Sequence, residues 1–144
     1  MAWGESGELF AINGDDLLTL SLEDQTVETR ASDLKKDSPQ HLPFSGANIL
    51  FDIAVGPDGT AFVAYYGNRQ LLAVSPAGVV SVLVQSESPW SPHGVDVWGD
   101  YVYFLESTVG GRPRWKFWGK DRIAPRVRRV SVGTSTLETI YDGL

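Results

Sequence analysis

The residues best suited to chemistry in this chain are concentrated in one segment near its carboxyl end, residues 107–124. This segment reads STVGGRPRWKFWGKDRIA and places aromatic rings among cationic side chains. Its candidate binding residues are Arg112, Arg114, Trp115 and Trp118. Aromatic rings and arginine are the side chains most often found at binding hot spots. Such rings stack on sugars or bases, while the cations bind carboxylates or phosphates, so the segment predicts a site for a small molecule or a protein.

Two other interpretations of this segment remain open. The rings can be buried beneath the loop or against a second copy of the chain, with the cations left in solvent. The segment can also contact nucleic acid, because 8 of the 12 lysines and arginines lie between Arg112 and Arg129, where Asp121 is the only acid. The net charge of −6 argues against general nucleic-acid binding.

A few other polar or aromatic residues stand near the same end of the expected strands. Trp90 and His93 belong to an expected short loop over residues 87–93, and Glu106 ends a strand at the root of the basic segment. We expect Glu106 either to pair with an arginine of that segment or to bind a cation. Asp52 begins an expected inner strand, where its carboxylate can accept hydrogen bonds from backbone amides.

No catalytic motif accompanies these residues. The 144-residue chain has no cysteine, its serines lack a His-Asp partner pattern, and its glycine pairs lack the context of a phosphate-binding loop. Its first residues do not resemble a signal peptide, and no apolar run approaches the roughly 20 residues that span a bilayer. We therefore expect a soluble protein of undetermined compartment and favour a binding module over an enzyme.

An internal repeat organises the rest of the sequence. The units cover residues 1–31, residues 46–86 and residues 90–144, the last interrupted by the insertion 107–124. Phe10, Phe62 and Tyr103 hold one position in the three units, and Val74 and Val130 are each followed by a serine. Short runs of aromatic and β-branched residues between tight turns predict four antiparallel strands in each unit. The fold class is therefore all-β, with each unit forming one propeller blade.

The repeat motifs resemble a known family. The run PDGTAFVAYYGN, from Pro57, is similar to the signature of NHL repeats, and WSPHGVDVWGDYVYFLES followed by PRVRRVS resembles the closing blade of SMP-30/gluconolactonase-like propellers. The resemblance implies a β-propeller and covers nearly the whole chain. It also implies an alternative function, a metal-dependent lactonase with Ca²⁺ or Mg²⁺ at the channel mouth, for which Asn48, Asp52 and Glu106 are the candidate ligands.

Three blades are too few for a closed ring, because propellers typically close with about four to eight. An open arc would expose apolar flanks and strand edges. The chain is either half of a six-bladed parent, or it closes a six-bladed ring as a homodimer about a two-fold axis. We predict the homodimer.

Overall fold

Twelve β-strands form three separate four-stranded sheets in the computed structural model, which describes residues 1–35, 49–108 and 125–143. The first sheet contains β1 (Ala2–Trp3), β2 (Leu9–Asn13), β3 (Asp16–Ser21) and β4 (Thr26–Ala31). The second contains β5 (Leu50–Val55), β6 (Ala61–Tyr65), β7 (Gln70–Val74) and β8 (Val80–Gln85). The third contains β9 (Trp90–Trp98), β10 (Tyr101–Thr108), β11 (Pro125–Ser131) and β12 (Leu137–Asp142).

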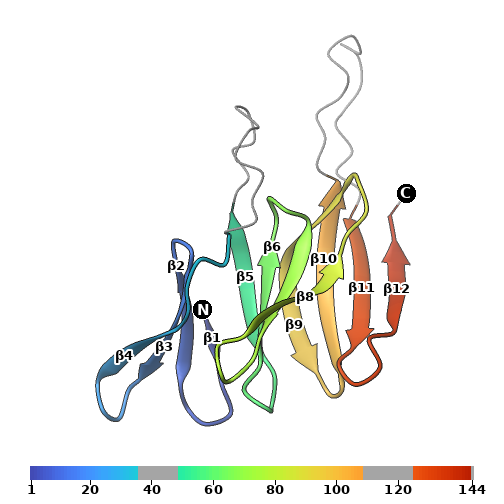
Figure 1. Ribbon diagram of the computed structural model, residues 1–144. Helices are drawn as coiled ribbons and strands as arrows, with labels where there is room; N and C mark the ends of the chain where they lie inside the picture. The colour runs from blue at the N-terminus through green and yellow to red at the C-terminus, as the bar shows by residue number, and fades with distance from the viewer. Residues whose placement is uncertain (36–48, 109–124, 144) are drawn as a thin grey trace.

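The three sheets are consecutive blades, each an antiparallel meander in chain order. They stand side by side (Figure 1), and the first strands β1, β5 and β9 lie along the inner edge, where β5 contacts both others. No helix in the part of the chain that the structure describes is long and apolar enough to cross a membrane. The expected all-β fold with three four-stranded blades is therefore confirmed.

Apolar side chains fill the two seams between neighbouring blades. Because side chains alternate between the faces of a strand, a blade with neighbours on both sides is buried on both faces. All five residues of β6, in the central blade, are buried. One face of β6 belongs to a core cluster shared with blade 1, built around Phe10, and the other to a cluster shared with blade 3, built around Phe104.

The strand register confirms the equivalences read from the repeat. Phe10 of β2 faces blade 2, and Phe62 of β6 faces blade 3. Tyr103 of β10 lies beside the buried Val102 and Phe104 and therefore points away from blade 2, in the same sense along the arc. The three aromatic residues thus occupy one position in successive blades.

One expected loop is a strand. Residues 90–92 pair with β10, so β9 begins at Trp90 rather than after His93. The sequence was misleading because proline is rare inside strands. A register shift between Leu105 and Glu106 accommodates Pro92 and leaves His93 as the extra residue of a β-bulge. Ser107 also pairs, with Pro125, so β10 includes two residues that the sequence assigned to the insertion.

Asp52 joins blade 2 to blade 3 through its carboxylate. Its Oδ2 accepts a hydrogen bond of 3.0 Å from the backbone N–H of Val95 in β9, and its Oδ1 accepts one of 2.9 Å from the N–H of Ile53. Asp96 makes only the local bond of this kind, to the N–H of Val97 at 2.8 Å. Asp52 therefore has the expected structural role of accepting hydrogen bonds from backbone amides, and it ties together two inner strands.

We predict that Asp52→Asn lowers the free energy of unfolding by about 1–3 kcal/mol, because an amide with one acceptor oxygen leaves one of the two backbone donors unpaired. The matched control is Asp96→Asn, which breaks no bond between blades and should change stability by less than about 0.5 kcal/mol. Urea unfolding followed by tryptophan fluorescence measures both values. Equal losses in the two variants would contradict a role for Asp52 between blades.

Candidate functional site

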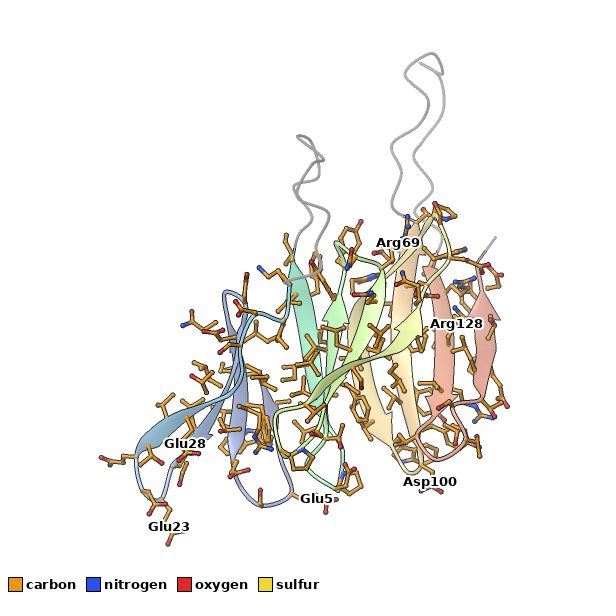
Figure 2. All side chains as sticks on the ribbon, in the orientation of Figure 1. Glu5, Glu23, Glu28, Arg69, Asp100 and Arg128 are labelled. Carbon is orange, nitrogen blue, oxygen red and sulfur yellow. The ribbon has the colours of Figure 1, made fainter. Side chains whose placement is uncertain are left out.

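The two ends of the blades differ, and the candidate residues belong to one of them. We call the loop end the end that carries the connections β6–β7 and β8–β9, where β10 finishes and β11 begins. We call the turn end the end that carries the short turns β5–β6, β9–β10 and β11–β12. Figure 2 shows Arg69 at the loop end and Asp100 at the turn end. Trp90, His93 and Glu106 all lie toward the loop end.

The basic segment leaves and returns at one point of the loop end. Its flanking residues Ser107 and Pro125 are directly opposed in the β10–β11 pair. The predicted binding residues Arg112, Arg114, Trp115 and Trp118 lie outside the described residues, as does Asn48. What the structure does describe is the base on which this segment stands.

That base is a group of charged and aromatic residues in the seam between blades 2 and 3, which we call the seam cluster. It consists of Ser86, Glu87, Trp90, Glu106, Arg126 and Arg128. At its centre is Glu106, which is fully buried. The Oε2 of Glu106 accepts a hydrogen bond of 2.7 Å from Nε of Arg126, and its Oε1 accepts one from the hydroxyl of Ser86. Glu106 is thus paired with an arginine, and that arginine belongs to β11.

Arg126 connects the rest of the cluster. Its Nη1 donates a 3.0 Å hydrogen bond to Oε1 of Glu87 in the β8–β9 connection, and its guanidinium carbon lies 4.3 Å from the centre of the Trp90 ring. Trp90 is only 4% exposed. Its ring therefore packs beneath Arg126, and in the described structure it presents little surface to a ligand.

Burial and charge act against each other on the two arginines. Burial would lower the pKa of Arg126, but the hydrogen bonds and charges of Glu106 and Glu87 raise that pKa above its ordinary value. Burial lowers the pKa of Arg128, and the charge of Glu106, whose Oε2 lies 3.8 Å from Nη1 of Arg128, only partly offsets it. Within the described residues, Nη2 of Arg126 and Nε of Arg128 are buried without a hydrogen-bond partner. Two N–H groups of the seam cluster can therefore still donate a hydrogen bond.

A second group at the loop end is aromatic and more open. Phe51 lies edge-on to Tyr66 and to His93, with ring centres 5.2 Å and 6.3 Å apart. Phe51 and His93 are the bulged residues of the inner strands β5 and β9, so they occupy equivalent positions. Phe51 is 51% exposed, whereas Nδ1 of His93 is buried with no partner among the described residues. We call these three residues the inner aromatic group.

The described residues do not fit a divalent cation. Both carboxylate oxygens of Asp52 accept hydrogen bonds from backbone amides, and Glu106 is paired with Arg126 and lies near Arg128. Two guanidinium groups near one carboxylate repel any further cation. In the part of the chain that the structure covers, no group of three or more His, Cys, Asp or Glu could hold a metal ion.

The sequence did not single out four members of the seam cluster, Ser86, Glu87, Arg126 and Arg128. A signal was present, because Arg126 and Arg128 alternate with Val127 in an expected strand that faces the acidic Glu106. Counting them with the basic segment concealed their role. Arg126, Arg128 and Arg129 each lie within 4 Å of a glutamate carboxylate, at 2.7, 3.8 and 2.8 Å.

Comparison with solved structures shows which fold the three blades belong to. The chain superposes on a gluconolactonase from Xanthomonas campestris with a TM-score of 0.66 and 19% identity, covering 98% of this chain and 46% of that one. The chain has the fold of half a β-propeller. It also superposes on virginiamycin B lyase from Staphylococcus aureus (TM-score 0.51, 14% identity, 95% of this chain and 53% of that one). A third match is a chain of a nidogen–laminin complex (TM-score 0.51, 10% identity, 94% of this chain and 61% of that one).

These similarities establish the architecture and no particular activity. The chain spans about half the length of the solved structures it matches, and they include both enzymes and a protein complex. No protein-family model matches the sequence, and no curated protein matches it. Since propellers host many unrelated functions, the function has to be argued from the surface of this chain.

We predict that Arg126→Met destabilises the protein by about 3–5 kcal/mol, because Glu106 would then be buried without its main partner. Adding Glu106→Gln should recover most of this loss by removing the uncompensated charge. Thermal and urea unfolding measure both variants. Lys35→Met is the control, because Lys35 lies outside the seam cluster and pairs with the exposed Asp15, and its loss should be much smaller. An equal loss would show that the burial of Glu106 does not matter.

Proposed function

We propose that this chain is a binding module that closes a six-bladed ring with a second copy of itself and binds ligands at the loop end. The observation that carries the proposal is the chemistry of the two outer faces of the arc. Blades 1 and 3 each have one face against blade 2 and one face with no neighbour in the described structure. Both open faces carry apolar side chains that a propeller seam would bury.

The open face of blade 1 is an apolar row. Trp3, Leu9, Leu20 and Val27 are directly opposed across β1, β2, β3 and β4, so their side chains lie on one face. Leu9 is the neighbour of Phe10, which faces blade 2, so this row faces the opposite way. Val27 is 60% exposed. A soluble single blade would normally carry polar residues at such positions.

The open face of blade 3 is apolar and aromatic. Leu105, Val127 and Tyr141 are directly opposed across β10, β11 and β12. Beside them, the guanidinium carbon of Arg129 lies 4.3 Å from the centre of the Tyr101 ring. A patch of this composition, larger than scattered surface residues, is typical of an interface.

A second copy of the chain supplies the neighbouring blade that each open face lacks. We call the face that a blade turns toward the next blade in the chain its leading face, and the opposite one its trailing face. Each seam within the chain joins a leading face to a trailing face. The open face of blade 3 is a leading face, and the open face of blade 1 is a trailing face. Two copies related by a two-fold axis would join each leading face to a trailing face and leave none open. Two sets of three blades also match the six-bladed propellers of which this chain covers about half.

We expect light scattering on a sizing column to give a mass near twice the 15.8 kDa of one chain. Val27→Lys should shift the protein to the single-chain mass, because a charge would be buried in the new seam. Val79→Lys is the matched control and should keep the doubled mass. Val79 is 65% exposed, like Val27, but precedes β8 at the turn end.

The outcomes that contradict closure by two copies are specific. A single-chain mass for the unmodified protein would do so. A ladder of larger masses would indicate open polymers rather than a closed ring. Equal effects of Val27→Lys and Val79→Lys would show that the open face of blade 1 is not the interface.

The loop end is the binding surface in this proposal. The inner aromatic group lies there, and Glu106 and Arg126 of the seam cluster flank the segment that contains Arg112, Arg114, Trp115 and Trp118. Rings and cations together suit a ligand with a flat or ring-shaped body and a carboxylate. A closed ring would carry two such segments around one channel.

We expect a trimer of galacturonate, which combines sugar rings with carboxylates, to bind and change the tryptophan fluorescence. Replacing both Trp115 and Trp118 with alanine should weaken binding by about tenfold or more through the loss of stacking. Replacing Arg112 and Arg114 with alanine should remove the preference for this trimer over the neutral galactose trimer. Equal binding of the two trimers by the unmodified protein would contradict the assignment.

A further inference from the structure

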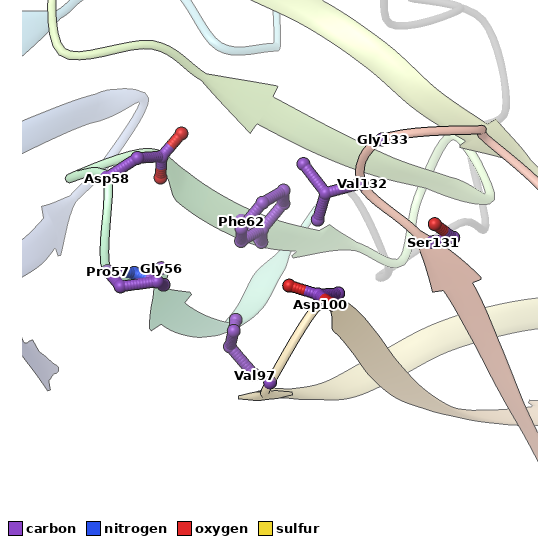
Figure 3. Close-up of a pocket in the computed structure, with 10 residues that line it drawn as sticks. Gly56, Pro57, Asp58, Phe62, Val97, Asp100, Ser131, Val132 and Gly133 are labelled. Atoms are coloured by element: carbon purple, nitrogen blue, oxygen red, sulfur yellow. The ribbon is translucent and has the colours of Figure 1, made fainter.

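The turn end contains a cavity between blades 2 and 3 that belongs to neither the seam cluster nor the inner aromatic group. Its volume is about 360 Å³. The β5–β6 turn, the β9–β10 turn and the β11–β12 turn form its walls, and the Phe62 ring and Val97 contribute apolar surface (Figure 3). All of its lining residues are described, and both open faces of the arc lie elsewhere.

The charged side chains that line this cavity are all acidic. The lining includes the carboxylates of Asp58 and Asp100 and no lysine, arginine or histidine. Asp58 is held in place by Thr60, whose N–H donates to Oδ1 at 3.0 Å and whose hydroxyl donates to Oδ2 at 2.8 Å. Figure 3 shows Asp58, Phe62 and Asp100 around the same space. The cavity therefore combines an aromatic ring with two acids.

The seam between blades 1 and 2 contains the equivalent position. The β1–β2 turn repeats the β5–β6 turn: Gly4 N–H donates to Glu8 O at 2.9 Å, as Gly56 N–H donates to Thr60 O at 2.8 Å. A Cβ placed on Gly4 would lie 3.0 Å from the Phe10 ring, and one on Gly56 would lie 3.3 Å from the Phe62 ring. The two phenylalanines thus occupy matching places under matching turns.

A guanidinium group occupies that equivalent position. The guanidinium carbon of Arg30 lies 5.3 Å from the centre of the Phe10 ring. Its Nη1 donates a 2.8 Å hydrogen bond to the backbone carbonyl of Pro76 in the β7–β8 turn, and its Nη2 lies 3.7 Å from Oε2 of Glu8. Pro76 follows Ser75 as Val132 follows Ser131, so the matching carbonyl in the cavity belongs to Val132. The chain itself therefore shows which group this kind of seam accepts.

Blade 2 lacks the arginine that would fill the cavity. Arg30 is the bulged residue of β4, between Thr29 and Ala31 in the pairing with β3. The bulged residue of β8 is Leu83, between Val82 and Val84. Leu83 is apolar and packs against the core shared by blades 2 and 3. The seam between blades 1 and 2 is thus completed by Arg30, whereas the seam between blades 2 and 3 has the phenylalanine, the carbonyl and two aspartates but no cation.

We propose that the cavity at Phe62 is a binding site for a guanidinium group on a short alkyl stem, as in an arginine side chain. The guanidinium lies between the two carboxylates, against an apolar floor formed by Phe62, which is only 2% exposed. It donates to the Val132 carbonyl and to the carboxylates of Asp58 and Asp100, which suit its planar set of donors. The stem packs on Val97 and Pro57.

The test is an NMR titration of the full chain with three blocked amino acids: N-acetyl-arginine amide, N-acetyl-lysine amide and N-acetyl-norleucine amide. The arginine probe should bind most tightly and shift the resonances of Phe62 and Val132, and the norleucine probe should not bind. Asp100→Asn should weaken binding of the arginine probe about threefold to fivefold, as loss of one partly exposed ion pair does. Glu23→Gln, which removes the same charge at the far end of blade 1 (Figure 2), should leave the affinity unchanged.

A second variant tests the equivalence of the two seams. Arg30→Leu empties the seam between blades 1 and 2, so the arginine probe should then bind at two sites per chain instead of one, with new shifts at Phe10. Binding of norleucine as tightly as arginine, or equal affinity in Asp100→Asn and the unmodified protein, would overturn the proposal. Free L-arginine and an acetylated Gly-Arg-Gly peptide distinguish the source, because a site for a small molecule binds both and a site for a protein segment binds only the peptide.

Discussion

The burial of sheet faces against one another is the constraint on which the rest of this structure depends. A four-stranded blade has two faces, and in the central blade the strand β6 is buried on both of them. Neither outer blade can satisfy the same requirement within the described structure, because each has a neighbour on one side only. The surfaces left over are Trp3 and Val27 at one end of the arc and Leu105, Val127 and Tyr141 at the other. The apolar faces left open at the two ends of the arc are thus a direct consequence of how the core is built.

The same seams determine where polar groups can stand. A carboxylate between two sheets is stable only where partners reach both of its oxygens. Asp52 meets this requirement with two backbone amides, and Glu106 with Arg126 and Ser86. Both groups lie toward the loop end, where they tie blade 2 to blade 3. Because their oxygens already accept these hydrogen bonds, the two carboxylates are poorly suited to bind a metal ion.

The two seams at the turn end are equivalent in position but differ in what occupies them. Both seams contain the same kind of turn, a phenylalanine and a backbone carbonyl, and they differ in the type of one bulged residue. Arg30 completes one seam from within the chain, while Leu83 leaves the other with a cavity lined by two aspartates. Repeated scaffolds are suited to this kind of change, because a substitution in one blade leaves the fold of the others intact.

The sequence by itself determined the blades, because aromatic and β-branched runs between glycine turns repeat with matched anchors at Phe10, Phe62 and Tyr103. It also predicted that Glu106 pairs with an arginine, although it placed that arginine in the segment 107–124 and not in β11. Only the tertiary structure decided which arginine that is, that Trp90 lies beneath it, and that His93 belongs to a strand, because each depends on pairing across strands or blades. The cavity at Phe62 was likewise invisible in the sequence, since it depends on how three turns from two blades meet. Local patterns specify strands, but the space between sheets exists only once they are packed.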